Sequence, residues 1–384
     1  MQFIDLGSQQ KRIRPKIEAN IQAVLDHGHY IMGPEVFKLE QTLAEFVHAK
    51  HAIACASGTD ALLMALMAYG VKPGDAILTT PFTFIATAEV ISLLGATPVF
   101  VDIDPQTYNL DPSQLELAIQ AIQDNDAQKY PLPAHESPLT PKGIIPVDLF
   151  GLPADYDQIN AIAQKYHLFV IEDAAQSFGA EYQNRKAGAL ANVGCTSFFP
   201  AKPLGCYGDG GMCFTDDDTF AEVLKSLRVH GQGHHKYDNI RIGLNGRIDT
   251  LQAAILLAKF DIFPEEVELR QQAAQRYTQL LMEQSAVVTP VVPEERKSVW
   301  AQYSVLAQDE QDRSALQARL QKAGIPTAIY YPKPLHLQTA FTPLTYHEGD
   351  FPVSERISRQ IFSIPMHPYL TQQEQEDIVK IIKE

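Results

Sequence analysis

The sequence predicts an α/β protein with a mainly parallel sheet and a second, smaller unit at the C-terminal end. Three observations predict this class. Short apolar stretches alternate with helical ones over residues 52–215, an order typical of parallel sheets covered by helices. Small polar or acidic residues follow directly after several apolar stretches, as at Ser57 and Asp173. A long helical pattern over 243–281 then leads away from the last apolar stretch and predicts a second domain.

Seven apolar stretches are expected to form the sheet, and they are Ala52–Cys55, Ala76–Thr80, Thr97–Val101, Gly143–Val147, Leu168–Ile171, Cys195–Phe199 and Gly211–Thr215. Hydrophobic periodicity and helix-start signals predict the helices. In the first 260 positions these are Ile13–Leu25, Gly33–Val47, Ala61–Tyr69, a helix ending at Leu94, one opening at Asp111, Tyr156–Tyr166 and Asp217–Arg228. The C-terminal unit is expected to contain a strand over Trp300–Leu306 and the helices Ser314–Ala323, Val353–Phe362 and Thr371–Ile382.

Composition and charge exclude several classes of function. The 384 residues carry 31 Lys and Arg against 46 Asp and Glu, a net charge of −15, with no basic tract. This balance argues against a nucleic-acid-binding protein. The start of the chain is unlike a signal peptide and no apolar run reaches membrane-spanning length, so we expect a cytoplasmic protein without membrane insertion. Four cysteines without paired spacing are expected to be buried free thiols: Cys55, Cys195, Cys206 and Cys213.

Two polar segments are predicted to be loops without chemistry. Residues 124–141 contain four prolines and almost no apolar periodicity, which predicts an exposed loop insertion; a binding loop is the alternative. His230, His234 and His235 lie close together. Because no carboxylate or cysteine nearby completes a ligand set, we predict no metal site there.

The turn after the first predicted strand has the features of a phosphate seat. Ser57, Gly58, Thr59 and Asp60 separate strand 52–55 from an apolar-rich helix. Such a helix start offers free N–H groups and the positive end of the helix dipole. These groups bind anions, so we expect a phosphate here. The alternative is that Ser57 or Thr59 only caps the helix, although a cap and a phosphate seat can coexist.

Lys202 is the residue around which the predicted chemistry is organised. It lies in a glycine-rich connection between the predicted strands Cys195–Phe199 and Gly211–Thr215. An amine in an apolar setting has a lowered pKa and becomes a nucleophile towards carbonyls. This is the chemistry of a Schiff-base lysine, for which pyridoxal phosphate (PLP) is the natural carbonyl. The alternative is an ordinary lysine in a hairpin-like connection.

The other parts that PLP needs occur in a consistent order along the chain. Asp173, at the end of a predicted buried strand, would pair with the pyridine nitrogen of the cofactor, although it could instead cap the next segment. Phe84 would stack on the ring. Ser57-Gly58-Thr59 and Ser197 would hold the phosphate.

With these residues in place, the sequence resembles the DegT/StrS family of sugar-nucleotide aminotransferases, which have the aspartate aminotransferase fold (PLP fold type I). The resemblance implies that Lys202 is the lysine bound to PLP, that Asp173 is the pyridine partner and that Gln176 lies near the ring hydroxyl. It also implies a homodimer in which Asn245 reaches the phosphate of the neighbouring subunit's cofactor. The matching blocks are GHYIMGPEVFKLE, ASGTDAL, PFTFIATAEVISLLGATPVFVDID, IPVDLFG, VIEDAAQSFGA, TSFFPAKPLGCYGDGGM, GLNGRIDTLQAAIL, YYPKPLHLQ and SIPMHPYL.

Within the family, the similarity is greatest to enzymes that aminate UDP-2-acetamido-2-deoxy-3-keto-glucuronic acid at C3, with L-glutamate as donor and 2-oxoglutarate as product. This implies a role in lipopolysaccharide or O-antigen synthesis. Arg247 would then bind the sugar carboxylate, and Tyr330 and Tyr331 would line the sugar pocket. The branch is expected to have histidine where Tyr330 stands, and its 124–141 loop is usually shorter. We expect a large PLP domain over 1–258 and a small α+β domain over 259–384.

Alternative functions remain at this stage. The first is a C4 or C3 aminotransferase for a UDP- or dTDP-keto-deoxysugar that lacks a carboxylate, for which Arg247 would have no use. The second is another PLP reaction, either cysteine desulfuration through Cys206 or Cys55 or sugar dehydration. The third is a PLP-binding sensor or scaffold. A nicotinamide-dependent dehydrogenase is disfavoured because no GxGxxG opens a strand–helix unit.

Overall fold

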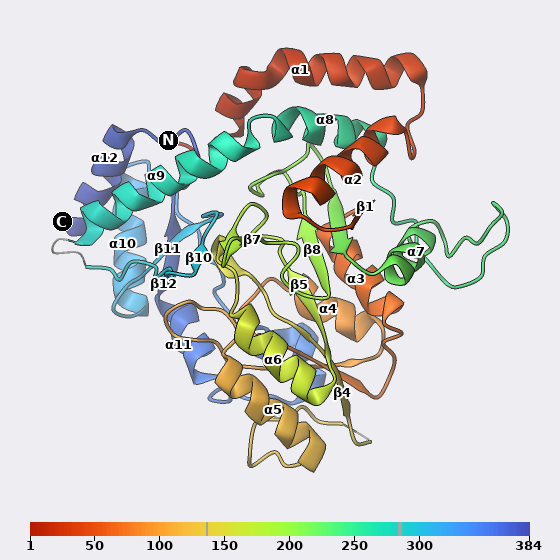
Figure 1. The fold of residues 1–384 in the computed structure, drawn as a ribbon. Helices are drawn as coiled ribbons and strands as arrows, with labels where there is room; N and C mark the ends of the chain where they lie inside the picture. The colour runs from red at the N-terminus through yellow and green to blue at the C-terminus, as the bar shows by residue number, and fades with distance from the viewer. Residues whose placement is uncertain (136, 283–285) are drawn as a thin grey trace.

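The computed structural model describes residues 1–135, 137–282 and 286–384. Its centre is a seven-stranded sheet in the order β1-β9-β8-β5-β4-β2-β3 (Figure 1). The strands are β1 (His51–Cys55), β2 (Asp75–Thr79), β3 (Thr97–Phe100), β4 (Thr140–Ile145), β5 (Phe169–Asp173), β8 (Val193–Ser197) and β9 (Gly211–Thr215). All seven predicted sheet strands are therefore confirmed, with ends that differ by a few residues.

Strand β9 is the one antiparallel member of this described sheet. It pairs antiparallel with both β1 and β8, whereas the β8–β5, β5–β4, β4–β2 and β2–β3 pairs are parallel. Strands β1, β5 and β8 thus point the same way. Their carboxyl ends, which carry Ser57, Asp173 and Ser197, meet at one edge of the sheet, where ligands bind in open α/β folds.

Alternating side chains of each strand enter two hydrophobic cores. In β1, Ala52 and Ala54 face one core, and Ile53 and Cys55 face the other. This is the two-residue period of a strand buried on both faces. The first core contains α2 (Pro34–Val47), α5 (Pro112–Asp124), α6 (Tyr156–Tyr166) and α8 (Thr250–Phe260), and the second contains α3 (Gly58–Ala68), α4 (Ala86–Leu93) and α7 (Asp218–Leu227). The architecture is three-layered, with helices on both faces of the sheet.

A separate core lies towards the C-terminal end. It is built by α9 (Phe263–Met282), α10 (Glu310–Lys322), α12 (Gln372–Lys383) and the strands β11 (Tyr303–Leu306) and β12 (Ile361–Ile364). Helix α11 (Pro352–Gln360), short strands β6 (Glu181–Tyr182), β7 (Arg185–Lys186) and β10 (Arg296–Lys297), and 3-10 turns at Leu149–Gly151, Leu335–Leu337 and Thr339–Leu344 complete the described elements. The division at residue 258 remains a prediction.

Three local predictions are wrong. Helix α1 (Leu6–His27) begins before Ile13, because the Asp5 side chain caps it by accepting a hydrogen bond from the Ser8 backbone N–H at 2.9 Å. The helical pattern 243–281 is two helices, α8 and α9, rather than one. The end of the predicted helix Val353–Phe362 belongs to β12, which pairs antiparallel with β11.

The 124–141 segment is not only a solvated loop. Tyr130 is buried, and its hydroxyl accepts a hydrogen bond from the Asp102 backbone N–H at 3.0 Å. The Ala134 backbone N–H donates to the Leu344 carbonyl at 2.9 Å, and Leu139 is buried just before β4 begins. The prediction failed because these anchors contact residues far away in the sequence.

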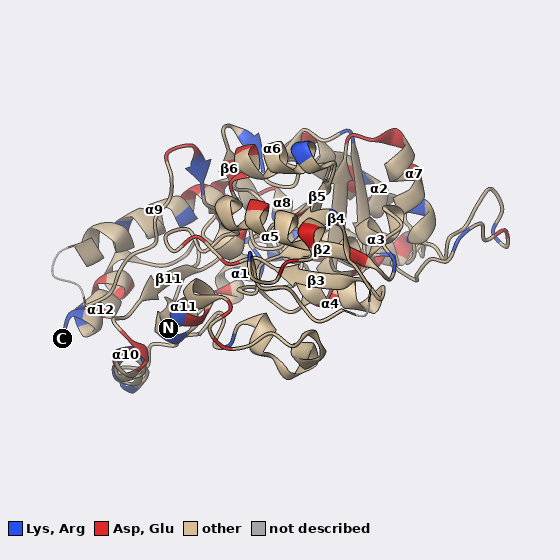
Figure 2. Cartoon of the chain, turned by 90° about the horizontal axis from the view of Figure 1, so that it is seen from below, with Lys and Arg blue, Asp and Glu red and all other residues tan. Residues whose placement is uncertain are grey.

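In the cartoon of Figure 2, Lys and Arg positions are interspersed with Asp and Glu positions along the chain. None of the described helices is long and apolar enough to span a membrane.

Candidate active site

The Ser57–Gly58 turn lies directly against the end of β8. The Ser57 hydroxyl accepts a hydrogen bond from the Asp60 backbone N–H at 3.0 Å and so caps α3. A Cβ atom on Gly58 would lie 2.7 Å from the Ser197 Cβ, and one on Gly211 would lie 2.3 Å from the Ser57 carbonyl oxygen. Only glycine allows these approaches. They bring the predicted phosphate residues Ser57, Gly58 and Ser197 into contact at the start of a helix, with Thr59 half-buried on its first turn.

Asp173 ends β5 and is 5% exposed. One of its carboxylate oxygens accepts a hydrogen bond from the Thr87 hydroxyl at 2.8 Å, and the other accepts one from the Ala175 backbone N–H at 3.2 Å. The capping role considered from the sequence is therefore present. Burial raises the pKa of Asp173, whereas these hydrogen bonds and the charge of Lys202 lower it. A buried carboxylate that accepts two neutral hydrogen bonds can bind a protonated ring nitrogen as its cationic partner.

Lys202 lies within a closed loop between β8 and β9. The loop begins at Phe198 and ends at Cys206. It is closed by a hydrogen bond from the Cys206 backbone N–H to the Phe198 carbonyl at 2.8 Å. Burial lowers the pKa of Lys202, and Asp173 opposes that shift. Among the described residues, no hydrogen bond or ion pair engages the Lys202 amine. The amine is therefore available to react with a carbonyl group.

Gln176 connects the cofactor side of the site with the predicted sugar side. Its amide oxygen accepts a hydrogen bond from the Phe150 backbone N–H at 2.8 Å, and its amide nitrogen donates to the Tyr331 hydroxyl at 3.2 Å. Burial raises the pKa of Tyr331, which keeps this hydroxyl protonated. The Tyr330 ring lies between Tyr331 and Phe3, with centroid separations of 5.9 and 6.4 Å.

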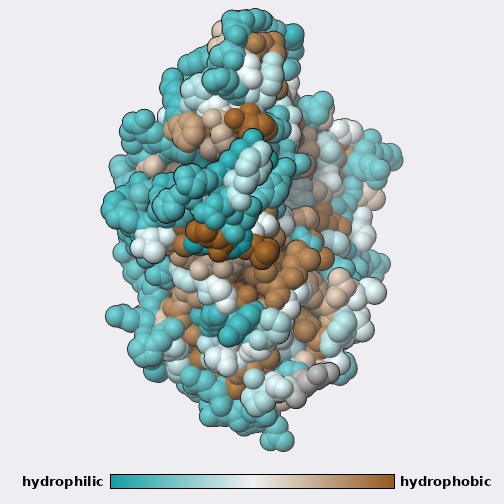
Figure 3. Space-filling view, turned by 90° about the vertical axis from the view of Figure 1, so that its right-hand side faces the viewer, coloured by the Kyte–Doolittle hydropathy of each residue, from teal (hydrophilic) through white to brown (hydrophobic). Residues whose placement is uncertain are grey.

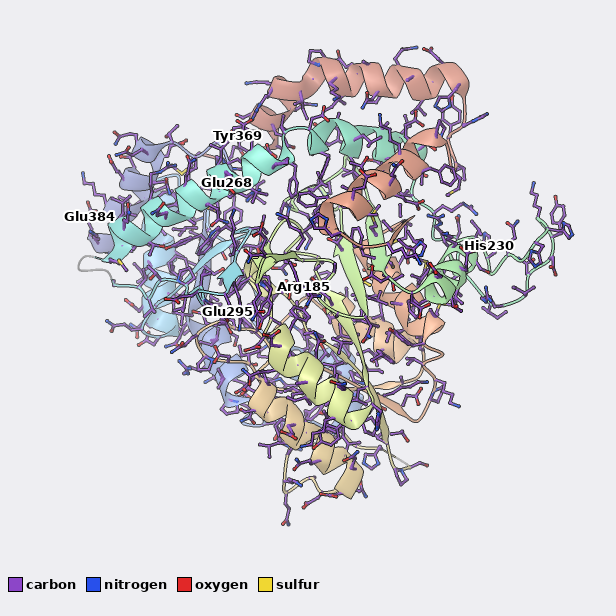
Figure 4. All side chains as sticks on the ribbon, in the orientation of Figure 1. Arg185, His230, Glu268, Glu295, Tyr369 and Glu384 are labelled. Carbon is purple, nitrogen blue, oxygen red and sulfur yellow. The ribbon has the colours of Figure 1, made fainter. Side chains whose placement is uncertain are left out.

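Phe84 and Asn245 are exposed in the single chain. Phe84 is 56% exposed, and its carbonyl accepts a hydrogen bond from the backbone N–H of Thr87, the residue whose hydroxyl donates to Asp173. Asn245 and Arg247 belong to the end of a loop that starts at His230 beside α7 and projects from the molecule (Figure 4). This loop returns to the phosphate turn, because the Ala56 backbone N–H donates to the Gly246 carbonyl at 3.0 Å.

The Arg247 side chain is partly buried and has an N–H group without a hydrogen-bond acceptor among the described residues. The residue is half-buried, and its Nε atom is buried without a hydrogen-bond partner in the described part of the chain. The Nε atoms of Arg228, Arg313 and Arg319 are also buried without a partner in the described ranges, so this feature alone does not mark a binding site. Arg247 differs in that it follows Gly246, whose carbonyl is bonded to the strand end before the Ser57 turn.

Two findings go beyond the sequence prediction. Thr87 and Phe150 are direct partners of Asp173 and Gln176, and neither was predicted. The one signal in the sequence that could have pointed to Thr87 is its hydroxyl, three positions after the predicted site residue Phe84.

Burial also raises the pKa of Cys55 and Cys206. A thiol nucleophile needs a lowered pKa, so the structure gives no support to desulfuration through either residue.

The sheet is covered by helices on both faces, and one of its edges carries the Lys202 loop and the buried carboxylate of Asp173. This arrangement is that of a PLP enzyme with the aminotransferase fold. The chain belongs to the DegT/DnrJ/EryC1/StrS aminotransferase family, whose model matches residues 11–383. The protein is thus a PLP-dependent transaminase, and solved structures with the same fold hold the cofactor as PLP or as pyridoxamine phosphate (PMP).

Individual relatives cover nearly the whole chain. A UDP-2-acetamido-2-deoxy-3-oxo-D-glucuronate aminotransferase of Pseudomonas aeruginosa is 52% identical over 370 residues, 96% of each protein. A UDP-N-acetyl-3-dehydro-alpha-D-glucosamine 3-aminotransferase of Acidithiobacillus ferrooxidans is 37% identical and covers 99% of this chain and 96% of that protein. A solved aminotransferase of the family from Brucella abortus has a TM-score of 0.93 at 50% identity, over 100% of this chain and 98% of that one.

Proposed function

We propose that this enzyme transfers the amino group of L-glutamate to C3 of UDP-2-acetamido-2-deoxy-3-keto-glucuronic acid. The observation that carries the acceptor is Arg247, whose buried Nε has no partner among the described residues and whose segment is bonded to the phosphate turn. A guanidinium binds both oxygens of a carboxylate through two parallel hydrogen bonds. The 52% identity to an enzyme named for this sugar supports the same choice.

Two residues of the chain are assigned to the chemical steps, Lys202 to proton transfer and Asp173 to charge stabilisation. When bound, PLP supplies the carbonyl that receives the amino group and the ring that accepts the electron pair of the broken C–H bond. The Lys202 amine removes and returns protons at the reacting carbon, which requires that it be neutral near pH 7, the direction in which burial moves its pKa. Asp173 holds positive charge at the ring nitrogen.

The remaining contacts hold the cofactor and the sugar. Ser57, Thr59 and Ser197 and the α3 N-terminus bind the phosphate, because this helix start presents free N–H groups. Gln176 is fixed by Phe150 and Tyr331 and orients the ring hydroxyl.

We also propose that the active unit is a homodimer with shared sites. Large apolar side chains are exposed on the molecule, among them Phe84, Phe199, Ile240 and Ile242. Hydrophobic atoms gather on the face from which the 230–247 loop projects (Figure 3). A second copy would cover this surface and bring Asn245 to the neighbouring phosphate. The protein should therefore elute as a dimer, and Ile242→Asp should weaken both the dimer and the PLP affinity.

The acceptor is tested with two UDP-linked 3-keto sugars that differ only in the presence of the C6 carboxylate. The wild type should prefer the uronate. Arg247→Met should raise KM for the uronate by about tenfold to a hundredfold, the value of hydrogen bonds to a charged group. Its KM for the neutral sugar should stay the same.

Arg241→Met controls for disturbance of the same loop, since Arg241 lies six positions earlier and is also half-buried. If Arg247→Met affected both acceptors alike, Arg247 would not be the carboxylate ligand.

A second candidate acceptor is a UDP-keto-sugar without a carboxylate, which the 37% identical relative supports. Faster turnover of the neutral sugar by the wild type would favour it.

A further inference from the structure

A second lysine is buried beside the loop that carries Lys202. Lys259, on α8, is 1% exposed, and its ammonium donates a hydrogen bond to the Gly205 carbonyl at 2.6 Å. The ammonium also lies 4.5 Å from the centroid of the Tyr207 ring. No carboxylate forms an ion pair with Lys259 in the described ranges. Burying an ammonium without a paired anion is unfavourable, and Lys is rarely placed so.

The Lys259 contact reaches the loop near its closed end. Gly205 lies three positions after Lys202 and directly before Cys206, whose backbone N–H and thiol both bond to the Phe198 carbonyl, at 2.8 and 3.0 Å. A Cβ on Gly205 would lie 2.6 Å from the carbonyl oxygens of Phe199 and Pro200, so the two halves of the loop touch here. Fixing the Gly205 carbonyl therefore fixes how the loop folds on itself.

Helix α8 holds this connection at two points on one face. Gln252 accepts a hydrogen bond from the Tyr207 backbone N–H at 2.9 Å, and Lys259 follows it by seven positions, two helical turns. The helix itself is buried between α1 and α2. The connection from β8 to β9 that bears Lys202 is thus bonded to the buried helix α8 at Tyr207 and at Gly205.

We propose that Lys259 is a positioning residue for Lys202: its buried ammonium holds the Gly205 carbonyl and keeps the 198–206 loop closed. The charge matters as well as the hydrogen bond. Burial lowers the pKa of Lys259 to about 8, with Glu266 and Cys206 opposing the shift, so the group is mostly protonated near neutral pH. The consequence for catalysis rests on the proposed role of Lys202, whereas the closed loop is a property of the chain alone.

The cysteines of the protein provide a direct measurement of loop opening. All four thiols are buried, and Cys206 is the one inside the Lys202 loop, while Cys55, Cys195 and Cys213 lie in the sheet strands β1, β8 and β9. Under native conditions, the labelling rate of a buried thiol follows the fraction of time for which its segment is open. Cys206 therefore reports the loop, and the other three report the sheet.

The test is labelling of the cofactor-free protein with a thiol reagent, with each cysteine quantified by peptide mass spectrometry. Lys259→Met keeps the length and apolar stem of the side chain and removes its charge and donor. We expect Cys206 to be labelled about tenfold faster than in the wild type, as for loss of a hydrogen bond to a charged group, with unchanged rates at the sheet cysteines.

Lys142→Met is the matched control. Lys142, in β4, also donates to a glycine carbonyl, that of Gly70 at 2.8 Å, and in addition pairs with Asp75 at 2.8 Å, so its loss removes at least as many contacts without touching the 198–206 loop. It should leave the Cys206 rate unchanged. If Lys259→Met does not fold, Lys259→Gln, which keeps an N–H donor on a shorter neutral side chain, takes its place with the same expected direction.

Two results overturn the proposal: an unchanged Cys206 rate, or equal acceleration at all four cysteines, which would mark Lys259 as merely structural. In the PLP-loaded enzyme, Lys259→Met should lower kcat more than it raises KM. If it accelerates Cys206 labelling but leaves kcat unchanged, Lys259 closes the loop but does not position Lys202 for the reaction; the role of Lys202 itself is tested separately by Lys202→Ala.

Discussion

Thr87 provides a sharp test of how the site maintains a charged Asp173. Its buried hydroxyl donates to the Asp173 carboxylate at 2.8 Å and lowers the pKa of that group against the opposing effect of burial. Thr87→Val replaces the hydroxyl with a methyl group of similar size. A hydrogen bond to a charged group contributes about 1.5–3 kcal/mol. If the charge is needed in the transition state, kcat should fall by about tenfold to a hundredfold.

The pH dependence has a predicted sign. If Asp173 has the proposed role, activity requires its carboxylate and should be lost as the pH falls through its pKa. Without the Thr87 hydroxyl, the pKa of Asp173 rises further, so the acid limb of the kcat profile should move to higher pH.

Thr79→Val is the control for this experiment. The Thr79 hydroxyl is fully buried in β2 and donates at the same 2.8 Å, but to the Ile145 carbonyl. This variant should lose stability without a change in kcat or in the pH profile. If Thr87→Val and Thr79→Val have the same kcat and the same acid limb, the Thr87 hydroxyl does not maintain the charge of Asp173.

Three further predictions concern the lysine, the phosphate turn and a buried carboxyl group. Lys202→Ala should lose at least about a hundredfold in transamination at an unchanged melting temperature; full turnover would disprove its role. Gly58→Ala must displace Ser197 by about 0.7 Å, the gap between the 2.7 Å approach and an ordinary 3.4 Å contact, and PLP titration should show about tenfold weaker binding. Burial beside Asp148 raises the pKa of Glu172 well above its usual 4.5, so its contribution to stability is lost as the pH rises above that value. Urea unfolding of Glu172→Gln should therefore show less loss of stability between about pH 5 and about pH 8 than the wild type; an equal loss would contradict this.

The sheet and most of its helices could be predicted because each strand is buried on both faces. Such strands are short continuous apolar runs, and the turn residues between them are local signals. Strand β12 was missed because Ile361–Ile364 continues the apolar pattern of α11 and becomes a strand only through its pairing with β11. The burial of Tyr130 likewise depends on Asp102, a distant partner that no local pattern reveals.

Site residues could be predicted where the residue type is unusual for its surroundings in the sequence. Lys202 and Asp173 are unusual in apolar surroundings, and the turn around Gly58 carries its own signal. Thr87 and Lys259 carry no such mark, since each acts through a hydrogen bond across the fold. Arg247 could be placed in the site only through resemblance, and its role stays a prediction, because an unpaired buried Nε also occurs at Arg228, Arg313 and Arg319.

The most direct test of the proposed reaction is a half-reaction spectrum of the PLP-loaded enzyme without any keto acid. UDP-2-acetamido-3-amino-2,3-dideoxy-glucuronic acid is added to one sample and a UDP-4-amino sugar to another. The account predicts that only the 3-amino uronate converts the visible absorption of PLP to that of PMP. Conversion by the 4-amino sugar alone would contradict the proposed substrate, and a protein with no PLP absorption would contradict the role of Lys202.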